Sequence, residues 1–184
     1  ENSFYRIIDR NDIRDVAIFK ANILDKLAAG KPIVIGTSSP RRTVMATGFL
    51  QKALPQLSQY PVQVEAIPIR GNVDGRLRKL SDLEDYDGII LAAAGLNRLL
   101  QYEPASKTLQ ELLANKRIMF LPLFECAPAA GQGAIVVETN KDNQEAIAIL
   151  NKMASLEHTN AVQEERLFAA KYGYGCSRPF SVFH

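Results

Sequence analysis

The stretch DGIILAAA at residues 87–94 constrains the fold of this chain more than any other feature. Its apolar residues follow one another without polar alternation, which is typical of a strand buried on both faces of a sheet. Shorter apolar strands are expected at residues 31–35, 61–69, 118–123 and 134–138. Helical signals mark residues 20–29, 41–54, 72–80, 107–116, 144–156 and 160–172. Because helices alternate with strands, the sequence predicts an α/β domain with a mostly parallel sheet.

The composition excludes several classes of protein. Of the 184 residues, 47% are hydrophobic and 23% are charged, which fits a globular chain and not a disordered one. The formal net charge of +2 is too small to indicate nucleic acid or an anionic membrane as a partner. Cys126 and Cys176 are too few for a disulfide framework and lack metal-ligand spacing. We therefore expect reduced thiols in a cytoplasmic protein.

Both ends of the sequence have the pattern of strands. Residues 3–8 (SFYRII) follow the polar first residues, and residues 180–184 (FSVFH) alternate like the opening of another strand. We expect both stretches to be cut edges that lack their sheet partners. The sequence is therefore interpreted as a piece of a larger protein.

Arginines follow three of the predicted strands, each beside a glycine-containing turn. In the first turn, Ser39 is a natural helix N-cap and Pro40 suits the first helical position, but Arg41 and Arg42 then oppose the helix dipole. An anion bound there would offset this cost. The other two turns contribute Arg70, Asn72, Arg76, Gly95 and Arg98.

The carboxyl ends of strands in an open α/β sheet form a ligand crevice, so these arginines are expected around one cleft. Arginine binds carboxylates through two parallel hydrogen bonds, which favours a ligand with several carboxylates over a lone phosphate. The alternative is that each arginine is a solvated surface residue that happens to follow a turn. The motifs GxxxxGKS/T and GxGxxG after a strand are absent, which excludes the usual nucleotide-binding loops.

Cys176 lies in the segment GYGCSRP at residues 173–179, where two glycines allow a sharp turn that could project the thiol. It is either a small buried hydrophobe or a covalently modified thiol. His158 and His184 have no triad context, so a cysteine hydrolase is disfavoured, whereas attachment of a cofactor needs no resident base. Cys126 is interpreted as structural.

Taken together, these motifs resemble the porphobilinogen deaminase (hydroxymethylbilane synthase) family of tetrapyrrole biosynthesis. The resemblance rests on IGTSSPRR at 35–42, IRGNVDGRLRKL at 69–80, YDGIILAAAGLNRL at 86–99, APAAGQGAIVVE at 127–138 and GYGCSRP at 173–179. It spans nearly the whole chain in the expected order.

The resemblance implies three domains, of which the first two are built like type II periplasmic binding proteins. Residues 1–19 would be the hinge and the end of the first domain, and residues 20–126 would be all of the second. Residues 127–155 would return to the first domain, and residues 156–184 would begin the cofactor-bearing third domain.

The resemblance also implies site roles. Cys176 would carry a dipyrromethane cofactor through a thioether, and no metal is implied. The other cofactor contacts would be Arg41, Arg42, Arg70, Arg76, Ser39 and Gly95. The contacts to substrate and growing chain would be Arg98, Thr37, Ser38, Asn72 and Gln132.

The implied reaction joins four porphobilinogen molecules head to tail with release of ammonia, in a protein that is monomeric at full length. The family's catalytic aspartate belongs to an N-terminal segment with no counterpart in these residues, so no catalytic residue is assigned here and the chain alone is expected to be inactive. The alternative is a non-catalytic module of periplasmic-binding-protein type that holds a polycarboxylate or another oxyanion.

Overall fold

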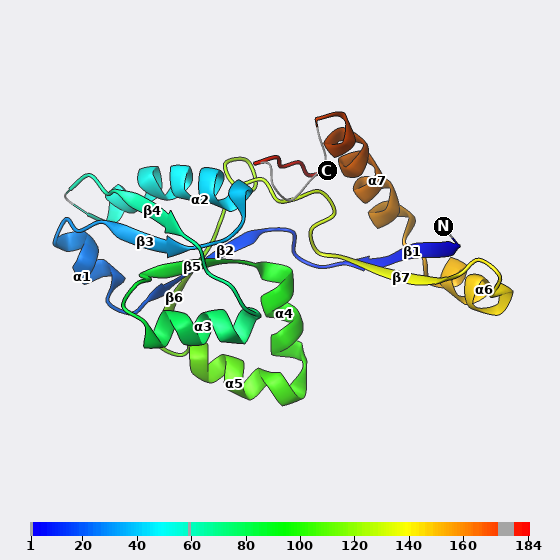
Figure 1. The fold of residues 1–184 in the computed structure, drawn as a ribbon, viewed down its shortest axis with the longest axis horizontal. Coiled ribbons are helices and arrows are strands. Elements are labelled where there is room, and N and C mark those ends of the chain that lie inside the picture. The colour runs from blue at the N-terminus through cyan, green and yellow to red at the C-terminus, as the bar shows by residue number, and fades with distance from the viewer. Residues whose placement is uncertain (1, 59, 173–178) are drawn as a thin grey trace.

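The computed structural model describes residues 2–58, 60–172 and 179–184 (Figure 1). Its strands are β1 (Ser3–Arg10), β2 (Asp15–Lys20), β3 (Ile33–Gly36), β4 (Val64–Ile67), β5 (Gly88–Ala92), β6 (Lys116–Phe120) and β7 (Ala134–Asn140). Its helices are α1 (Ile23–Ala28), α2 (Pro40–Ala53), the 3-10 turn η1 (Leu54–Leu57), α3 (Val73–Asp82), α4 (Ala93–Gln101), α5 (Glu103–Leu113), α6 (Gln144–Met153) and α7 (Leu156–Lys171).

Five strands form the main sheet in the order β4-β3-β5-β2-β6. The apolar run at residues 87–94 contains its central strand β5. The predicted α/β class is confirmed, and four of the five strands run in the same direction, while the antiparallel strand β2 makes the sheet mixed. Strand β3 runs parallel to β4 and β5, whereas β2 runs antiparallel to both β5 and β6. The difference arises because β2 inserts between two strands that run the other way.

The core lies on both faces of this sheet, as the apolar pattern of β5 requires. Along β2, Val16 and Ile18 pack toward one side with residues of α3, α4 and α5, while Ala17 and Phe19 pack toward the other with α1 and α2. Figure 1 shows the resulting layers, with α2 above the sheet and α3 and α5 below it. These four residues, 16–19, are each at most 3% exposed.

The position of β2 corrects the expected boundary at residue 19. Residues 15–19 pair with β5 and β6 inside the five-stranded sheet, so they belong to that unit and not to a partial first domain. The expectation that the strand-like N-terminal stretch lacks a partner is also wrong. Strand β1 pairs antiparallel with β7 over most of its length, with an irregularity between Ile7 and Asp9.

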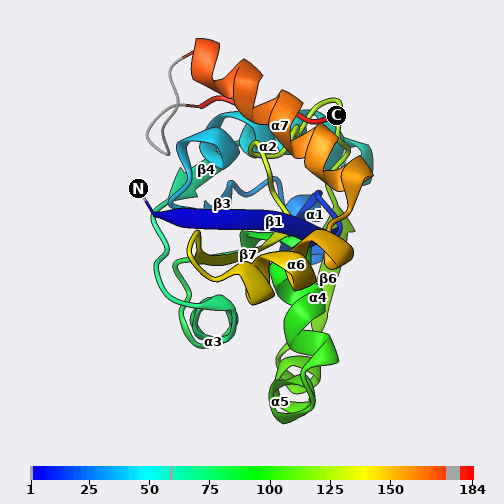
Figure 2. The ribbon, with the colours of Figure 1, turned by 90° about the vertical axis from the view of Figure 1, so that its right-hand side faces the viewer.

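Strands β1 and β7 form a two-stranded ribbon that extends away from the main sheet, and helices α6 and α7 pack against it (Figure 2). Helix α7 begins at Leu156, where the Ser155 side chain accepts a hydrogen bond from the backbone N–H of His158. The expected start at Asn160 is therefore wrong, because the stronger local cap lies one turn earlier.

Residues 179–184 form no strand, contrary to the expectation from their alternating pattern. The backbone N–H of Val182 donates to the carbonyl of Pro128, and the N–H of His184 donates to a carboxylate oxygen of Glu165. The Phe183 ring meets Phe124 edge-on at 6.0 Å between centroids. The segment thus docks on a loop and a helix, and the N–H groups of Val182 and His184 are not available for a sheet.

Two segments that connect the ribbon to the main sheet cross at Gly133. The N–H of Asn11 donates to the Gly133 carbonyl at 2.9 Å, and Gly133 has a positive φ of 83°. A Cβ atom at Gly133 would lie 2.5 Å from the carbonyl oxygen of Asn11. Only glycine fits this crossing without a shift of the backbone.

We expect Gly133→Ala to lower the free energy of unfolding by roughly 2 kcal/mol or more. Alanine would have to adopt the left-handed backbone conformation that glycine adopts at low cost, and its Cβ would clash with the backbone. Gly48→Ala is the matched control, since a Cβ there meets nothing within 4 Å and the residue lies in α2. That control should be neutral or slightly stabilising. Equal stability of the two variants in urea unfolding would contradict the close crossing.

Candidate functional site

The turn after β3 folds as its sequence predicts and brings two of the arginine-bearing turns together. The Ser39 hydroxyl accepts a 3.4 Å hydrogen bond from the N–H of Arg42, so Ser39 caps α2. The N–H of Thr37 donates to the carbonyl of Ile67, and the Ser38 hydroxyl donates to the carbonyl of Ile69. These bonds fasten the loop before α2 to the chain that leads into Arg70.

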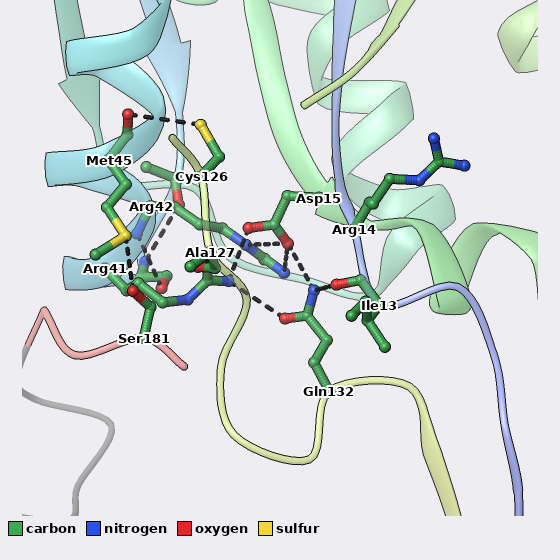
Figure 3. Close-up of polar contacts among 12 residues, drawn as sticks. Ile13, Arg14, Asp15, Arg41, Arg42, Met45, Cys126, Ala127, Gln132 and Ser181 are labelled. Carbon is green, nitrogen blue, oxygen red and sulfur yellow. Dashed lines mark hydrogen bonds and ion pairs between the residues drawn. The ribbon is translucent and has the colours of Figure 1, made fainter. Parts of the chain in front are cut away.

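Arg41 points inward from the first turn of α2 and is only 5% exposed (Figure 3). Its guanidinium donates to the carbonyl of Ala127 at 2.7 Å and to Oε1 of Gln132 at 3.2 Å, and it pairs with Asp15 at 2.7 Å. Burial lowers the pKa of Arg41, while the negative charge of Asp15 opposes that shift. Arg41 is thus held by acceptors that the protein itself provides.

Arg42 shares the same carboxylate. Its Nε and Nη2 both donate to Oδ1 of Asp15, at 3.1 Å and 2.9 Å. The sequence led us to expect an external anion beside these two cations. The structure instead shows Asp15, which is 1% exposed, as the counter-ion at this helix end. A charged residue that opens the apolar run 16–19 was the available signal for it.

Gln132 lies between the elements of this cluster. Its Nε2 donates to the carbonyl of Ile13 at 2.6 Å and to Oδ1 of Asp15 at 3.0 Å, while its Oε1 accepts from Arg41. The amide therefore uses both of its hydrogens and its oxygen inside the protein. These contacts position the residues around it, in addition to any contact with a ligand.

Arg70 and Arg76 carry positive charge that no carboxylate of the described residues neutralises. Nε of Arg76 donates to the carbonyl of Gly71 at 2.7 Å, and Asn72 caps α3 as expected. The pKa of Arg76 is lowered by burial and by the positive charges of Arg42 and Arg70. Arg42 and Arg70 therefore lie close enough to Arg76 to repel it, and these three residues are here called the arginine cluster.

Two expected members of the site, Arg98 and Gly95, lie on α4. Arg98 is in the last turn of α4, where its carbonyl accepts from the N–H of Tyr102, and within the described part of the chain its side chain makes no hydrogen bond or ion pair. Gly95 lies on the same helix, and a Cβ there would meet Val73 at an ordinary 3.7 Å. Cys176 lies outside the described residues.

A second buried ion pair attaches α7 to the loop that carries Gln132. Glu165 accepts from Nη2 of Arg10 at 2.8 Å, from the N–H of Gly131 at 2.7 Å and from the N–H of His184 at 2.8 Å. Nε of Arg10 donates to the backbone carbonyl of Gln132 at 3.1 Å. No pattern in the sequence paired Arg10 with Glu165, which lie 155 positions apart.

In the part of the chain that the structure describes, no group of three or more His, Cys, Asp or Glu side chains is placed to hold a metal ion. Among the same residues, no helix is both long enough and apolar enough to cross a bilayer.

Cys126 is buried in the core, and its thiol donates to the carbonyl of Met45 at 3.7 Å. Burial, aided by the charges of Asp15 and Glu125, raises the pKa of Cys126 from 9.0 to about 12. This supports its interpretation as a structural residue.

At pH 8 we expect iodoacetamide to leave Cys126 unmodified in the folded chain, because a shift from 9.0 to about 12 leaves roughly a thousandfold less thiolate. Mass mapping of the Cys126 peptide after alkylation, with and without urea, measures this. The unfolded chain is the control and should react fully. Alkylation at the same rate in both states would show that the thiol is accessible.

Known proteins are similar to this chain over most of its length. The sequence model described as porphobilinogen deaminase, dipyromethane cofactor binding domain, matches residues 2–148. Porphobilinogen deaminase of Geobacillus kaustophilus is 36% identical over 175 residues, which are 95% of this chain and 48% of that protein. The protein of the same name from Macrococcus caseolyticus is 38% identical over 173 residues, which are 94% of this chain and 48% of that protein. The chain thus spans about half the length of these curated relatives.

Similarity to solved structures is much weaker. The VFT2 domain of BvgS from Bordetella pertussis aligns with a TM-score of 0.34 and 17% identity, over 90% of this chain and 62% of that one. The family assignment therefore depends on the sequence match, which covers the turns that carry Arg41, Arg42, Arg70 and Arg76 and the loop that carries Gln132. On this ground the chain belongs to the porphobilinogen deaminase family.

Proposed function

We propose that this chain forms the cofactor-side part of a transferase that joins four porphobilinogen molecules head to tail into hydroxymethylbilane, with release of ammonia. Porphobilinogen as substrate, a cytoplasmic location and a monomeric full-length protein belong to the same proposal and depend on family membership. So do the assignments of residues 127–155 to a first domain and of residues 156–184 to a third.

The observation that carries the proposal is the arginine cluster. Arg42, Arg70 and Arg76 bring three positive charges close together, and the only carboxylate that pairs with any of them among the described residues is Asp15. Lys79 adds a fourth cation, since its Nζ donates to the backbone carbonyl of Arg70 at 2.8 Å. A surplus of guanidinium groups suits a ligand with several carboxylates.

The dipyrromethane cofactor named by the family match fits this donor set. A chain of two pyrroles, each with two carboxylates, would be held by Arg42, Arg70 and Arg76 through charge-assisted hydrogen bonds, with Cys176 as its covalent attachment. When bound, the cofactor supplies the terminal pyrrole from which the product grows. The arginines orient its carboxylates and balance their charge. Arg41 and Gln132 act behind them by fixing the start of α2.

The test compares two forms of one ligand in calorimetric titrations of the chain. A dipyrromethane with two acetate and two propionate side chains should bind with a stoichiometry of one. The corresponding tetra-amide, which has the same shape without the charges, should bind at least about 100-fold more weakly, since several charge-assisted hydrogen bonds are lost. Equal binding of both forms, or binding of neither, would argue against the proposal.

Covalent attachment is tested separately by mass. The chain purified from a bacterium that makes porphobilinogen should carry the mass of two linked pyrrole units on the peptide that contains Cys176. Cys176→Ser should remove this mass, whereas Cys126→Ala should keep it. An adduct on another residue would contradict the assignment of Cys176.

A further inference from the structure

Asp15 is the one carboxylate among the described residues that touches the arginines at the start of α2. Four N–H donor groups converge on it: Nη2 of Arg41, Nε and Nη2 of Arg42, and Nε2 of Gln132. Its side chain is 1% exposed. It opens strand β2, and its backbone carbonyl accepts from the N–H of Leu121, so its position is fixed by the main sheet.

The two arginines that share Asp15 are not equivalent. Arg41 has a 6% exposed side chain and three acceptors inside the protein, which makes it an internal support. Arg42 has a 14% exposed side chain, and its only side-chain acceptor among the described residues is Asp15. The Nε and Nη2 edge of Arg42 faces Asp15. A guanidinium has five N–H donors, so the second hydrogen of Nη2 and both hydrogens of Nη1 remain for a ligand. Asp15 thus occupies one of the two edges of Arg42 that can hold a carboxylate bidentately.

We propose that Asp15 is a specificity-determining residue: it occupies one bidentate edge of Arg42 and offsets part of the charge at α2, so that small anions gain little there. A single carboxylate that approaches Arg42 competes with Asp15 for the same donors and is repelled by its charge. A ligand with several carboxylates also reaches Arg70 and Arg76, which pair with no carboxylate of the described residues. Asp15 thereby favours long polycarboxylates over small anions. This inference rests on the proposed function of the arginine cluster.

The test measures acetate and citrate binding by chemical-shift titration of the arginine Nε–Hε signals in the full chain. Asp15→Asn should raise the affinity for acetate at least fivefold, because it removes a negative charge next to Arg42 and frees the Nε and Nη2 edge of Arg42 for acetate. Citrate should gain less, so the citrate-to-acetate preference falls. A residue with a merely structural role would weaken binding when replaced. Unchanged or weaker acetate binding would therefore overturn the proposal.

Asp12→Asn is the matched control, because it removes the same charge three residues before Asp15. The Asp12 carboxylate pairs with Arg14 at 2.6 Å. This control should change the acetate affinity less than twofold. A gain equal to that of Asp15→Asn would show a general charge effect and overturn the proposal.

A second variant covers the case in which Asp15→Asn fails to fold, as judged by near-ultraviolet circular dichroism. In Asp15→Asn combined with Arg41→Met, the buried pair is removed as a unit, which is often tolerated. The net charge matches that of the parent chain, yet Arg42 is released. Acetate affinity should again rise at least fivefold, and no rise would overturn the proposal. The acetate affinity is measured independently of dipyrromethane binding. A failure of this inference and a failure of the proposed function therefore give different results.

Discussion

Replacement of Glu165 by alanine should lower the free energy of unfolding by about 3–5 kcal/mol, because it leaves a buried charge without its partner. Glu165 is fully enclosed and accepts from Arg10, Gly131 and His184. Arg10, with a 6% exposed side chain, would keep its charge and lose its only carboxylate among the described residues. Helix α7 would lose its polar attachment to the loop at Gly131.

The neighbouring residue supplies the control for this prediction. Glu164 has a 57% exposed side chain and, within the part of the chain that the structure describes, pairs only with His184, at 3.0 Å. Exposed pairs of this kind contribute little, so Glu164→Ala should change the free energy of unfolding by less than about 1 kcal/mol. Urea unfolding followed by far-ultraviolet circular dichroism measures both variants. Similar losses in the two would show that the Arg10–Glu165 pair does not hold α7.

Replacement of Arg41 by alanine should also be strongly destabilising, by about 3 kcal/mol, although a positive charge in the first turn of a helix is by itself unfavourable. Without Arg41, the carbonyl of Ala127 and Oε1 of Gln132 lose a buried donor, and Asp15 loses its shortest ion pair. An unsatisfied buried acceptor is costly in addition to the lost pair.

Arg42→Ala tests the difference between the two adjacent arginines. Asp15 would keep Arg41 and Gln132 as partners, and the remaining pair is neutral, so the loss should be only about 1 kcal/mol. The same urea titrations measure it. If Arg42→Ala destabilised the chain as much as Arg41→Ala, the distinction between an internal support and a ligand-facing residue would be wrong.

The sequence identified most of the main sheet because its signals are local. The uninterrupted apolar run that includes residues 89–92 places β5 at the centre, and glycine-containing turns set the ends of β3 and the starts of α2 and α3. Residues 1–19 were expected, from the family resemblance, to form the hinge and the end of a first domain, so β2 was not expected in the main sheet. Its direction and its place between β5 and β6 are set by non-local pairing, which a local pattern does not encode.

The candidate site shows the same limit. The turns that carry Arg42, Arg70 and Arg76 were predictable from strand ends and helix caps. Asp15 was not, because its role depends on burial and on donors that lie 26 or more positions further along the chain. The unfavourable cations in the first turn of α2 did indicate a missing negative charge. They did not indicate whether the protein or a ligand supplies it, and in this structure the protein does.

The most direct test of the account is a titration of the chain with the dipyrromethane tetracarboxylate in three variants. Arg42→Ala and Arg76→Ala should each weaken binding by about 10-fold to 100-fold, as expected for one charge-assisted contact. Arg78→Ala is the control, since Arg78 is exposed on the same helix as Arg76 and should leave binding unchanged. Equal affinity in all three variants and the parent chain would contradict the claim that the arginine cluster holds a polycarboxylate.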